Sequence, residues 1–320
     1  MDVSVIVLTY NHEKYIRQAL DSILMQKTDF SYEILVGDDA STDGTQEILK
    51  EYGERYPNVI RLFLRQKNIG ASRNAYELLT SAKGEYLATC EGDDYWINDR
   101  KLQIQVSYLQ ENPKMMGCVH DCIIVNEDGE LLKNQKIEWV KTKEIFTLQD
   151  FQGIYLPGQY ATFVRRNIFL NPKYDYSIIY KAHPMVADRT AMMLYLQEGD
   201  IYHINRVMSC YRRHTKKDSK NITTLSYKNN PNHVQEDYQI LNQMEQYSDS
   251  VLNCKIKFEG RRRELFADAI FQWLKGAGND NLKTAKKIWA ERSGSIRYLL
   301  IIPFRFFQKL IRRIVNRRDL

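Results

Sequence analysis

The chain has 320 residues, of which 43% are hydrophobic and 12% aromatic, so it can build a packed core and is not disordered. Its five cysteines form no Cys-x-x-Cys pair, which argues against a zinc ribbon and a disulfide framework and favours a reducing, cytoplasmic compartment. The net charge of +6 is uneven, because residues 283–320 carry +9 and the first 282 residues sum to −3. Basic character confined to one end argues against nucleic acid as a ligand of the main body.

The first ninety residues alternate between short apolar runs and helical patterns. Strands are predicted at residues 3–8, 33–36, 59–63 and 85–89. Helices are predicted from 16 to 24, through Ile48 and Leu49, and from 71 to 82. This repetition implies right-handed crossovers and a mostly parallel sheet flanked by helices. In such an α/β fold, ligands bind beyond the carboxyl ends of the strands.

The pattern continues less regularly after residue 100. The predicted elements are a helix at 101–110, a hairpin at 123–132, a strand at 160–165, a helix at 188–196 and a strand at 200–211. A polar linker follows residue 216 and precedes helical segments near 233–247 and 255–275. We therefore expect a main domain at 1–220, a helical accessory region at 221–295 and a C-terminal helix at 296–320.

Two adjacent carboxylates, Asp93 and Asp94, directly follow the fourth predicted strand. Charge at the end of a buried strand is costly without a partner, and a divalent cation shared with phosphate is the natural one. The alternative is an acidic turn that caps the following helix. The polar segments 9–11 and 38–39 follow other strands and reach the same edge of the sheet. This convergence favours a cation site.

These segments resemble the inverting nucleotide-sugar glycosyltransferases of family 2, which have the GT-A fold. The matching motifs are residues 5–11 (Val-Ile-Val-Leu-Thr-Tyr-Asn), 37–45 (Gly-Asp-Asp-Ala-Ser-Thr-Asp-Gly-Thr), 68–70, 73–74, 83–86 and 91–96 (Glu-Gly-Asp-Asp-Tyr-Trp). The resemblance covers about residues 1–215, and its motifs are specific as an ordered set. It implies a GT-A type, mostly parallel nucleotide-binding sheet flanked by helices, with a helical C-terminal extension.

The resemblance assigns the donor side of the site. Thr9, Tyr10 and Asn11 would border the nucleotide base, with Tyr10 stacking on it, and Asp39 would accept a hydrogen bond from uracil. Packing of Tyr10 on the following helix is the alternative. Arg73 would pair with phosphate as a bidentate donor, although a surface salt bridge explains an arginine there equally well.

The resemblance also assigns a metal motif to Asp93 and Asp94, with Asp94 as the direct ligand of Mn²⁺ or Mg²⁺. Glu91 stands where many members have Asp, and we do not expect it to be a ligand. His214 follows a predicted strand and would add a metal ligand or touch the diphosphate; a histidine in a solvated turn is the alternative.

Asp188 occupies the position of the family's catalytic base, although Ala187 replaces the acidic residue or glycine that usually precedes it. An inverting displacement needs a carboxylate on the acceptor side to take the hydroxyl proton, and the nucleoside diphosphate needs a divalent ion to neutralise its charge as it leaves. The alternative for Asp188 is a carboxylate at a helix N-terminus, where the helix dipole favours it.

The last segment has the pattern of a basic amphipathic helix. Apolar residues recur at steps of three and four from Ile296 to Val315, and Arg and Lys occupy the other face. The apolar run 298–304 is too short to span a bilayer, so we expect this helix to lie on an anionic membrane surface. The alternative is a helix that docks on the protein's own core.

Together these features predict a cytoplasmic glycosyltransferase bound peripherally to the inner face of the membrane. It would move a hexose from a UDP-sugar to a hydroxyl of a glycan or lipid-linked glycan in bacterial surface polysaccharide biosynthesis.

Two alternatives remain. A sugar-nucleotide nucleotidyltransferase would need a phosphate loop rich in glycine and basic residues where this chain has Tyr-Asn-His-Glu at 10–13. A non-enzymatic nucleotide-sugar-binding assembly protein would retain the fold without turnover, and the four acids Asp39, Asp93, Asp94 and Asp188 argue against it. A dinucleotide-dependent oxidoreductase is disfavoured because no Gly-x-Gly-x-x-Gly follows the first strand.

Overall fold

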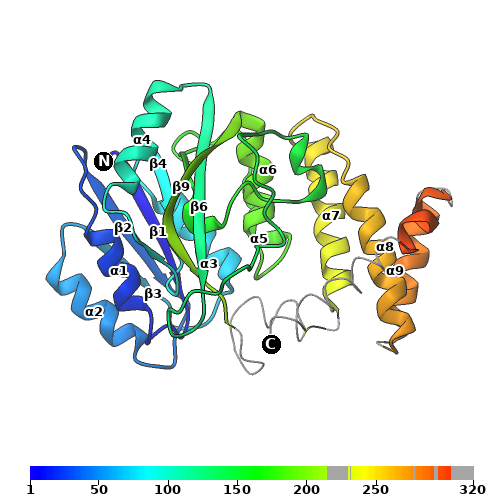
Figure 1. The fold of residues 1–320 in the computed structure, drawn as a ribbon, viewed down its shortest axis with the longest axis horizontal. Coiled ribbons are helices and arrows are strands. Elements are labelled where there is room, and N and C mark those ends of the chain that lie inside the picture. Colours follow the sequence, from blue (N-terminus) through cyan, green and yellow to red (C-terminus); the bar gives the residue numbers. More distant parts are fainter. Residues whose placement is uncertain (215–229, 231, 277, 292–294, 304–320) are drawn as a thin grey trace. The chain divides into compact units, whose positions relative to one another are not determined.

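A computed structural model describes residues 1–214, 230, 232–276, 278–291 and 295–303 of the chain (Figure 1). It divides into two compact units, the first containing Met1–Phe151 and Tyr155–Ser219, the second Gln152–Ile154 and Lys220–Leu320. The first unit holds the sheet and the second holds a group of helices.

In its described residues, the first unit is built on a nine-stranded mixed sheet with the order β3-β2-β1-β4-β8-β6-β9-β5, in which β7 also pairs with β9. The strands are β1 Val3–Thr9, β2 Tyr32–Asp38, β3 Ile60–Leu64, β4 Tyr86–Thr89, β5 Tyr95–Trp96, β6 Met115–Val125, β7 Ile145–Phe146, β8 Val164–Arg166 and β9 Asp200–Arg212. Strands β3, β2, β1 and β4 are parallel, as are β6 and β9, and β8 lies antiparallel between β4 and β6. The predicted α/β class is confirmed.

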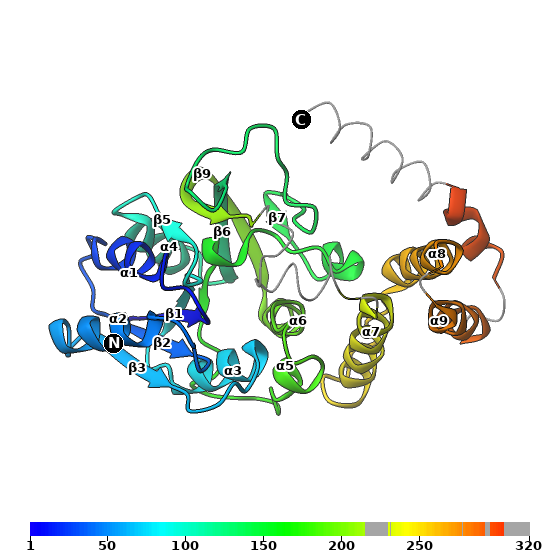
Figure 2. The same cartoon turned by 90° about the horizontal axis from the view of Figure 1, so that it is seen from below.

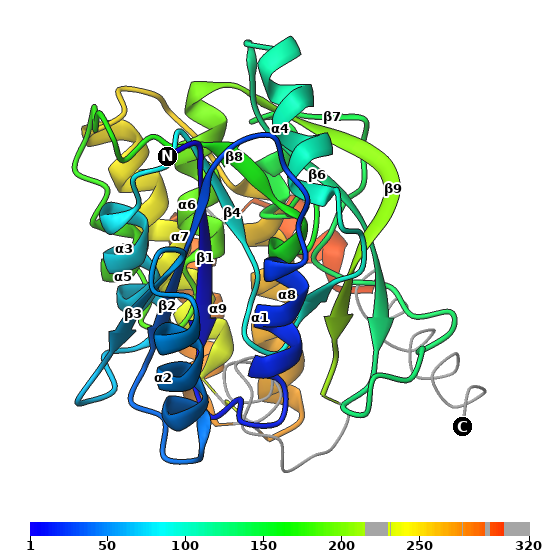
Figure 3. The same ribbon diagram turned by 90° about the vertical axis from the view of Figure 1, so that its left-hand side faces the viewer.

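Helices cover both faces of the parallel strands. The helices of the first unit are α1 Ile16–Leu24, α2 Thr45–Arg55, α3 Ala71–Ser81, α4 Lys101–Glu111, α5 Ile178–Lys181 and α6 Asp188–Glu198. The 3-10 turn η2 Tyr160–Thr162 also belongs to this unit, whereas the turn η1 Asp150–Gly153 spans the boundary between the two units. Figure 2 shows α1 and α4 on one face of the sheet and α3 on the other, and Figure 3 shows α1 and α2 in front of β1 and β2.

The alternation of side chains along β1 explains why helices pack on both faces of the sheet. Val3, Val5 and Val7 point to one face and join a buried cluster that includes Leu20 of α1 and Leu102 of α4. Alternate residues of a strand face opposite sides of its sheet, so a continuous apolar run predicts a strand buried on both faces. The run at 3–8 is therefore a central strand, as its composition indicates.

The register of the parallel strands aligns their ends. Thr9 of β1 pairs with Asp38 of β2, and Ile6 of β1 pairs with Thr89 of β4. The segments that follow these strands therefore leave the sheet at one edge. This edge carries the polar motifs 9–11, 38–39 and 91–96.

The structure corrects one expectation from the sequence in the first unit and bears out another in a shortened form. The predicted strand at 160–165 is the 3-10 turn η2 followed by β8, which begins only at Val164. The predicted hairpin at 123–132 is present in a short form: the chain turns at Gly129, where φ is 84°, Val125 and Leu131 form an antiparallel bridge, and the Leu132 N–H donates to the Ile124 carbonyl at 2.9 Å. Gln159 caps η2 by accepting a hydrogen bond from the Ala161 N–H, which diverts the chain from an extended path.

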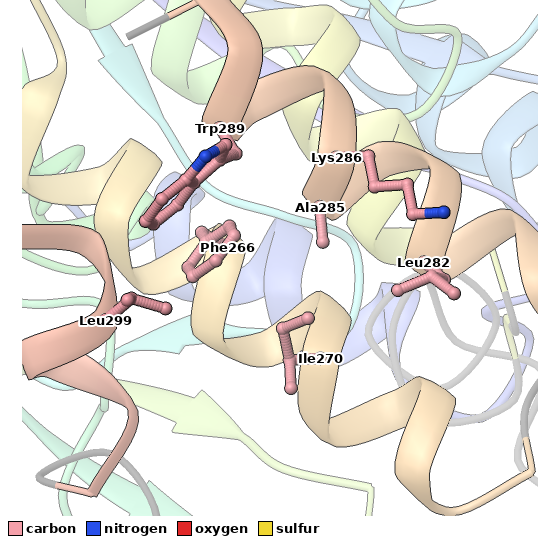
Figure 4. A pocket seen from close by; sticks show the side chains of 7 residues that line it. All are labelled: Phe266, Ile270, Leu282, Ala285, Lys286, Trp289 and Leu299. Carbon is pink, nitrogen blue, oxygen red and sulfur yellow. The ribbon is translucent and has the colours of Figure 1, made fainter. Parts of the chain in front are cut away.

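The second unit contains α7 His233–Ser250, α8 Glu259–Leu274 and α9 Asn279–Glu291, of which α9 was not predicted. Phe266 of α8 stacks on Trp289 of α9 with ring centroids 5.7 Å apart, and Tyr298 packs edge-on against Phe266 at 5.6 Å. The Tyr298 hydroxyl donates to Glu259 Oε1 at 2.6 Å. An apolar pocket of about 330 Å³ lies beside this aromatic cluster (Figure 4).

Of the predicted C-terminal helix at 296–320, residues 297–303 are helical, and residues 304–320 lie outside the described part of the chain. Among the helices that are described, none combines the length and the apolar character needed to cross a membrane.

Candidate active site

Backbone hydrogen bonds join the three polar segments at the edge of the sheet. The Asp39 N–H donates to the Thr9 carbonyl at 3.0 Å, and the Gly92 N–H donates to the Leu8 carbonyl at 2.8 Å. A Cβ atom at Gly92 would lie 2.8 Å from His12 Nδ1 and 2.9 Å from Thr9 Cβ. Only glycine therefore lets the acidic segment approach β1 this closely.

Three carboxylates gather in that segment. Glu91, Asp93 and Asp94 each offer an oxygen within 4.8 Å of the other two; Asp94 is buried and the others are half-buried. Burial, then the charges of Asp93 and Asp188, raises the pKa of Glu91 to about 8. Burial, then the charges of Asp93 and Glu91, raises the pKa of Asp94 well above its usual range. Burial of carboxylates that also repel one another marks a place where positive charge is favourable.

The donor set suits Mn²⁺ or Mg²⁺, because both are hard cations that prefer carboxylate oxygens. Glu91, which we did not expect to be a ligand, lies within reach of the same position as Asp93 and Asp94. The ligand assignment made from the sequence stays a prediction, with Glu91 as a geometrically competent addition.

Two histidines flank Asp93. His214 Nε2 lies 3.2 Å from Asp93 Oδ2 and His12 Nε2 lies 3.9 Å from the same oxygen. Burial works to raise the pKa of Asp93, but His12 and then His214 outweigh it, and the pKa lies below its usual value. His214 thus lies next to the acidic cluster, as a metal or diphosphate contact requires, although within the described residues the three-acid group does not include it.

Asp94 is held on both oxygens. The backbone N–H of Arg212 donates to Oδ1 at 2.7 Å, and Gln159 Nε2 donates to Oδ2 at 2.8 Å. The Arg212 guanidinium also donates to the Asp93 carbonyl at 2.8 Å and to Gln18 Oε1 at 2.8 Å. Arg212 therefore ties the end of β9 to the acidic segment and to α1.

The segment after β1 reaches the same edge. Thr9 Oγ1 is buried and has no hydrogen-bond partner among the described residues, whereas the residue Tyr10 is 39% exposed. Asn11 adopts a φ of 56°, and its Oδ1 accepts from the Thr42 N–H at 2.8 Å. An exposed aromatic ring beyond a strand end is available to stack on a flat ligand.

Asp39 is buried and fixes the loop that precedes α3. Its carboxylate accepts from the Ile69 N–H at 2.7 Å and from the Gly70 N–H at 3.0 Å. Burial raises the pKa of Asp39 despite these contacts. Each carboxylate oxygen has a second lone pair, so the predicted contact with uracil stays compatible with this arrangement.

The predicted base, Asp188, is the first residue of α6, and its Oδ1 accepts from the Arg189 N–H at 2.8 Å. The preceding loop contacts the start of α3, where the Ser72 N–H donates to the Pro184 carbonyl at 2.9 Å. The negative charge of Asp188 contributes to the raised pKa of Glu91, so Asp188 is close enough to interact electrostatically with the acidic cluster.

Arg73 occupies a more peripheral position. Its Nε donates to Glu77 Oε1 at 3.1 Å, and its guanidinium lies 5.5 Å from the Tyr180 ring centroid. The side chain is 57% exposed. The surface ion pair considered from the sequence is thus present, and phosphate binding by Arg73 stays a prediction.

The sequence did not single out His12, Gln159 or Arg212. Gln159 and Arg212 contact acids that lie 65 and 119 positions away in the chain. His12 lies beside the acidic segment because Gly92 allows that segment to come close to it. The only local signal was the position of His12 directly after the motif at 9–11.

The chain belongs to glycosyl transferase family 2, whose model matches residues 4–170. This confirms the family and the GT-A fold inferred from the sequence.

An uncharacterised protein of Mycobacterium tuberculosis is 36% identical to this chain over 222 residues. The match covers 66% of this chain and 59% of the relative, so the chain spans about three fifths of the relative's length. The putative teichuronic acid biosynthesis glycosyltransferase TuaG of Bacillus subtilis is 37% identical over 109 residues, covering 34% of this chain and 42% of TuaG. Among solved structures, S. aureus TarS 1-349 in complex with UDP-GlcNAc has a TM-score of 0.54 at 18% identity, covering 97% of this chain and 92% of TarS 1-349.

Proposed function

We propose that the protein is a metal-dependent inverting glycosyltransferase that moves a hexose from a UDP-sugar to a hydroxyl of a glycan or lipid-linked glycan. The observation that carries this proposal is the cluster of Glu91, Asp93 and Asp94 at the strand ends, next to the segments of Thr9 and Asp39. The UDP-GlcNAc in TarS supports a UDP-sugar donor. The description of TuaG supports a role in bacterial surface polysaccharide biosynthesis.

The donor would lie along the edge of the sheet. Tyr10 would stack on the base, Thr9 and Asn11 would border it, and Asp39 would accept from uracil. Asp93 and Asp94, with His214 beside them, would hold Mn²⁺ or Mg²⁺. The bound ion would supply neutralisation of the charge that develops on the departing diphosphate. Arg73 would approach the phosphates from the start of α3.

Asp188 would act on the acceptor. As the acceptor oxygen forms its bond to the anomeric carbon, Asp188 takes the hydroxyl proton, and the bond from that carbon to the diphosphate oxygen breaks. Attack on the face opposite the leaving group inverts the anomeric centre. This role is supported by the effect of the Asp188 charge on the pKa of Glu91, because that effect requires Asp188 to lie near the acidic cluster.

Residues 1–220 would perform this chemistry, with 221–295 as an accessory region. We propose that residues 296–320 bind the anionic inner face of the membrane, where a lipid-linked acceptor would be available. The exposure of Ile296, Leu299 and Leu300, at 68%, 47% and 67%, supports this, whereas the buried Tyr298 favours docking of the first turn on the second unit. The two interactions involve different residues, because Tyr298 and Leu299 lie beside Phe266, whereas Ile296 and Leu300 stay exposed.

A thermal-shift comparison tests the nucleotide assignment. In the presence of Mn²⁺, UDP should raise the midpoint of unfolding more than ADP or GDP does. Equal shifts for the three nucleotides would contradict the roles of Tyr10 and Asp39.

Hydrolysis of UDP-sugars with Mn²⁺ and with EDTA separates the alternatives. Metal-dependent release of UDP supports the transferase. Formation of UDP-sugar from UTP and a sugar phosphate would favour the nucleotidyltransferase, and binding without any turnover would favour the assembly protein.

A further inference from the structure

Gln159 approaches the acidic cluster from the loop that precedes η2, and only 4% of the residue is exposed. Its Nε2 lies 2.8 Å from Asp94 Oδ2 and 3.4 Å from Glu91 Oε2. One amide group therefore reaches two of the three acids. An NH₂ group has two N–H donors, which is the number that this bridge needs.

The orientation of the Gln159 amide is fixed by its other atom. Gln159 Oε1 accepts from the Ala161 N–H at 2.6 Å, so the NH₂ end must point to the acids. A flipped amide would place an oxygen against two carboxylates and a nitrogen against an N–H, and both contacts would be repulsive. The side chain thus has one workable orientation.

The loop that carries Gln159 is itself anchored to the sheet and to α4. Trp96 Nε1 donates to the Ala161 carbonyl at 3.2 Å, and Gln105 Nε2 donates to the Thr162 carbonyl at 2.9 Å. A Cβ atom at Gly158 would lie 2.9 Å from Val119 Cβ, so the loop lies directly on β6. Gln159 is therefore a donor held by a rigid support.

We propose that Gln159 is a positioning residue that holds Asp94 and Glu91 at the spacing required to bind a divalent cation. The proposal rests on the metal-dependent function proposed above. With the Arg212 N–H on Oδ1 and Gln159 on Oδ2, the Asp94 carboxylate cannot rotate, yet each oxygen keeps a lone pair. Gln159 is neutral, so it orders the acids without occupying the cation's position with another charge.

Calorimetric titration of Mn²⁺ in the presence of UDP tests this role. Replacing a group that orients a metal ligand typically weakens metal binding about 10- to 100-fold, and we expect a loss of that size for Gln159→Met, which keeps the length of the side chain but has no donor. Gln159→Ala provides a second variant without the donor. Affinity for UDP in EDTA should stay within about twofold of wild type, because the hydrogen bonds of Gln159 to described residues go to the acids and to its own loop.

Gln105→Ala is the matched control, because Gln105 anchors the same loop but donates to backbone carbonyls and a thiol instead of an acid. It should retain the wild-type Mn²⁺ affinity within about threefold, even if its midpoint of unfolding falls. An equal loss of Mn²⁺ affinity in Gln105→Ala, or wild-type affinity in Gln159→Met, would overturn the positioning role.

Two further outcomes keep the tests separate. If the wild-type protein binds no Mn²⁺ with UDP, the proposed metal-dependent function itself fails. If the Gln159 variants do not fold, the side-chain amide resonances of Gln159 in the wild-type protein still report on the role. They should shift when Mg²⁺ is added with UDP, and unchanged resonances would overturn the proposal.

Discussion

Lys101, the first residue of α4, provides the sharpest test of the energetics of this fold. Its side chain is fully buried, and its ammonium group lies 4.0 Å from the centroid of the Trp96 ring. Among the described residues Nζ has no hydrogen-bond partner. Burial lowers the pKa of Lys101 from 10.5 to about 7. The folded protein therefore disfavours the charged form of this side chain.

The cost follows from the two pKa values. At about 1.36 kcal/mol for each pH unit, the gap between 10.5 and about 7 corresponds to about 4 to 5 kcal/mol of lost stability at or below pH 7. Between pH 7 and 10.5 the unfolded chain binds a proton that the folded chain has released, so stability rises with pH in this window. Lys101→Met removes the ionisable group, and at pH 7 it should stabilise the protein by about 2 to 4 kcal/mol after loss of the contact with Trp96.

Denaturant unfolding at pH 6, 7, 8 and 9 measures this difference. The advantage of Lys101→Met over wild type should shrink by about 1 kcal/mol for each pH unit above 7. The comparison of two proteins cancels the other groups that titrate in this range. An advantage that does not change with pH, or a variant less stable than wild type at pH 7, would refute the assignment of Lys101 as an unpaired buried amine.

Three further predictions concern other parts of the chain. Burial works to raise the pKa of Glu33, but hydrogen bonds from Arg61, Ser4 and the Lys83 N–H outweigh it, so the pKa lies below 4.5. Wild type should therefore be more stable to unfolding than Glu33→Gln by about 1 to 3 kcal/mol. This difference should be complete above pH 4.5 and disappear as the pH falls below it. A constant advantage from pH 7 to 3 would contradict this. Asp39→Asn should reduce the preference for UDP over ADP in thermal-shift assays, and an unchanged preference would remove Asp39 from base recognition. Deleting residues 296–320 should release the protein from liposomes that contain acidic lipid, whereas continued sedimentation with them would exclude the tail as a membrane anchor.

Much of the site was predictable from the sequence because parallel strands end at a common edge. Once residues 3–8, 33–36 and 85–89 are identified as strands, the polar residues after them must meet, and the register of Thr9 with Asp38 confirms this. The start of α6 at Asp188 was also predictable, since an acidic residue precedes a continuous helical pattern.

The parts that escaped prediction depend on contacts between distant segments. Gln159 and Asp94 are 65 residues apart, and Arg212 and Asp94 are 118 apart, so no local periodicity connects them. The antiparallel insertion of β8 between β4 and β6 is likewise a property of the assembled sheet. Local patterns specify elements, whereas the groups that orient the acids appear only when the elements pack.

The most direct test of the central claim is to count bound Mn²⁺ by electron paramagnetic resonance in the presence of UDP. The wild-type protein should bind one ion per chain, and the Asp93→Asn, Asp94→Asn double variant, which preserves the size of both side chains, should bind none at the same concentrations. Equal Mn²⁺ binding by the two proteins would show that the acids at the end of β4 do not form the cation site.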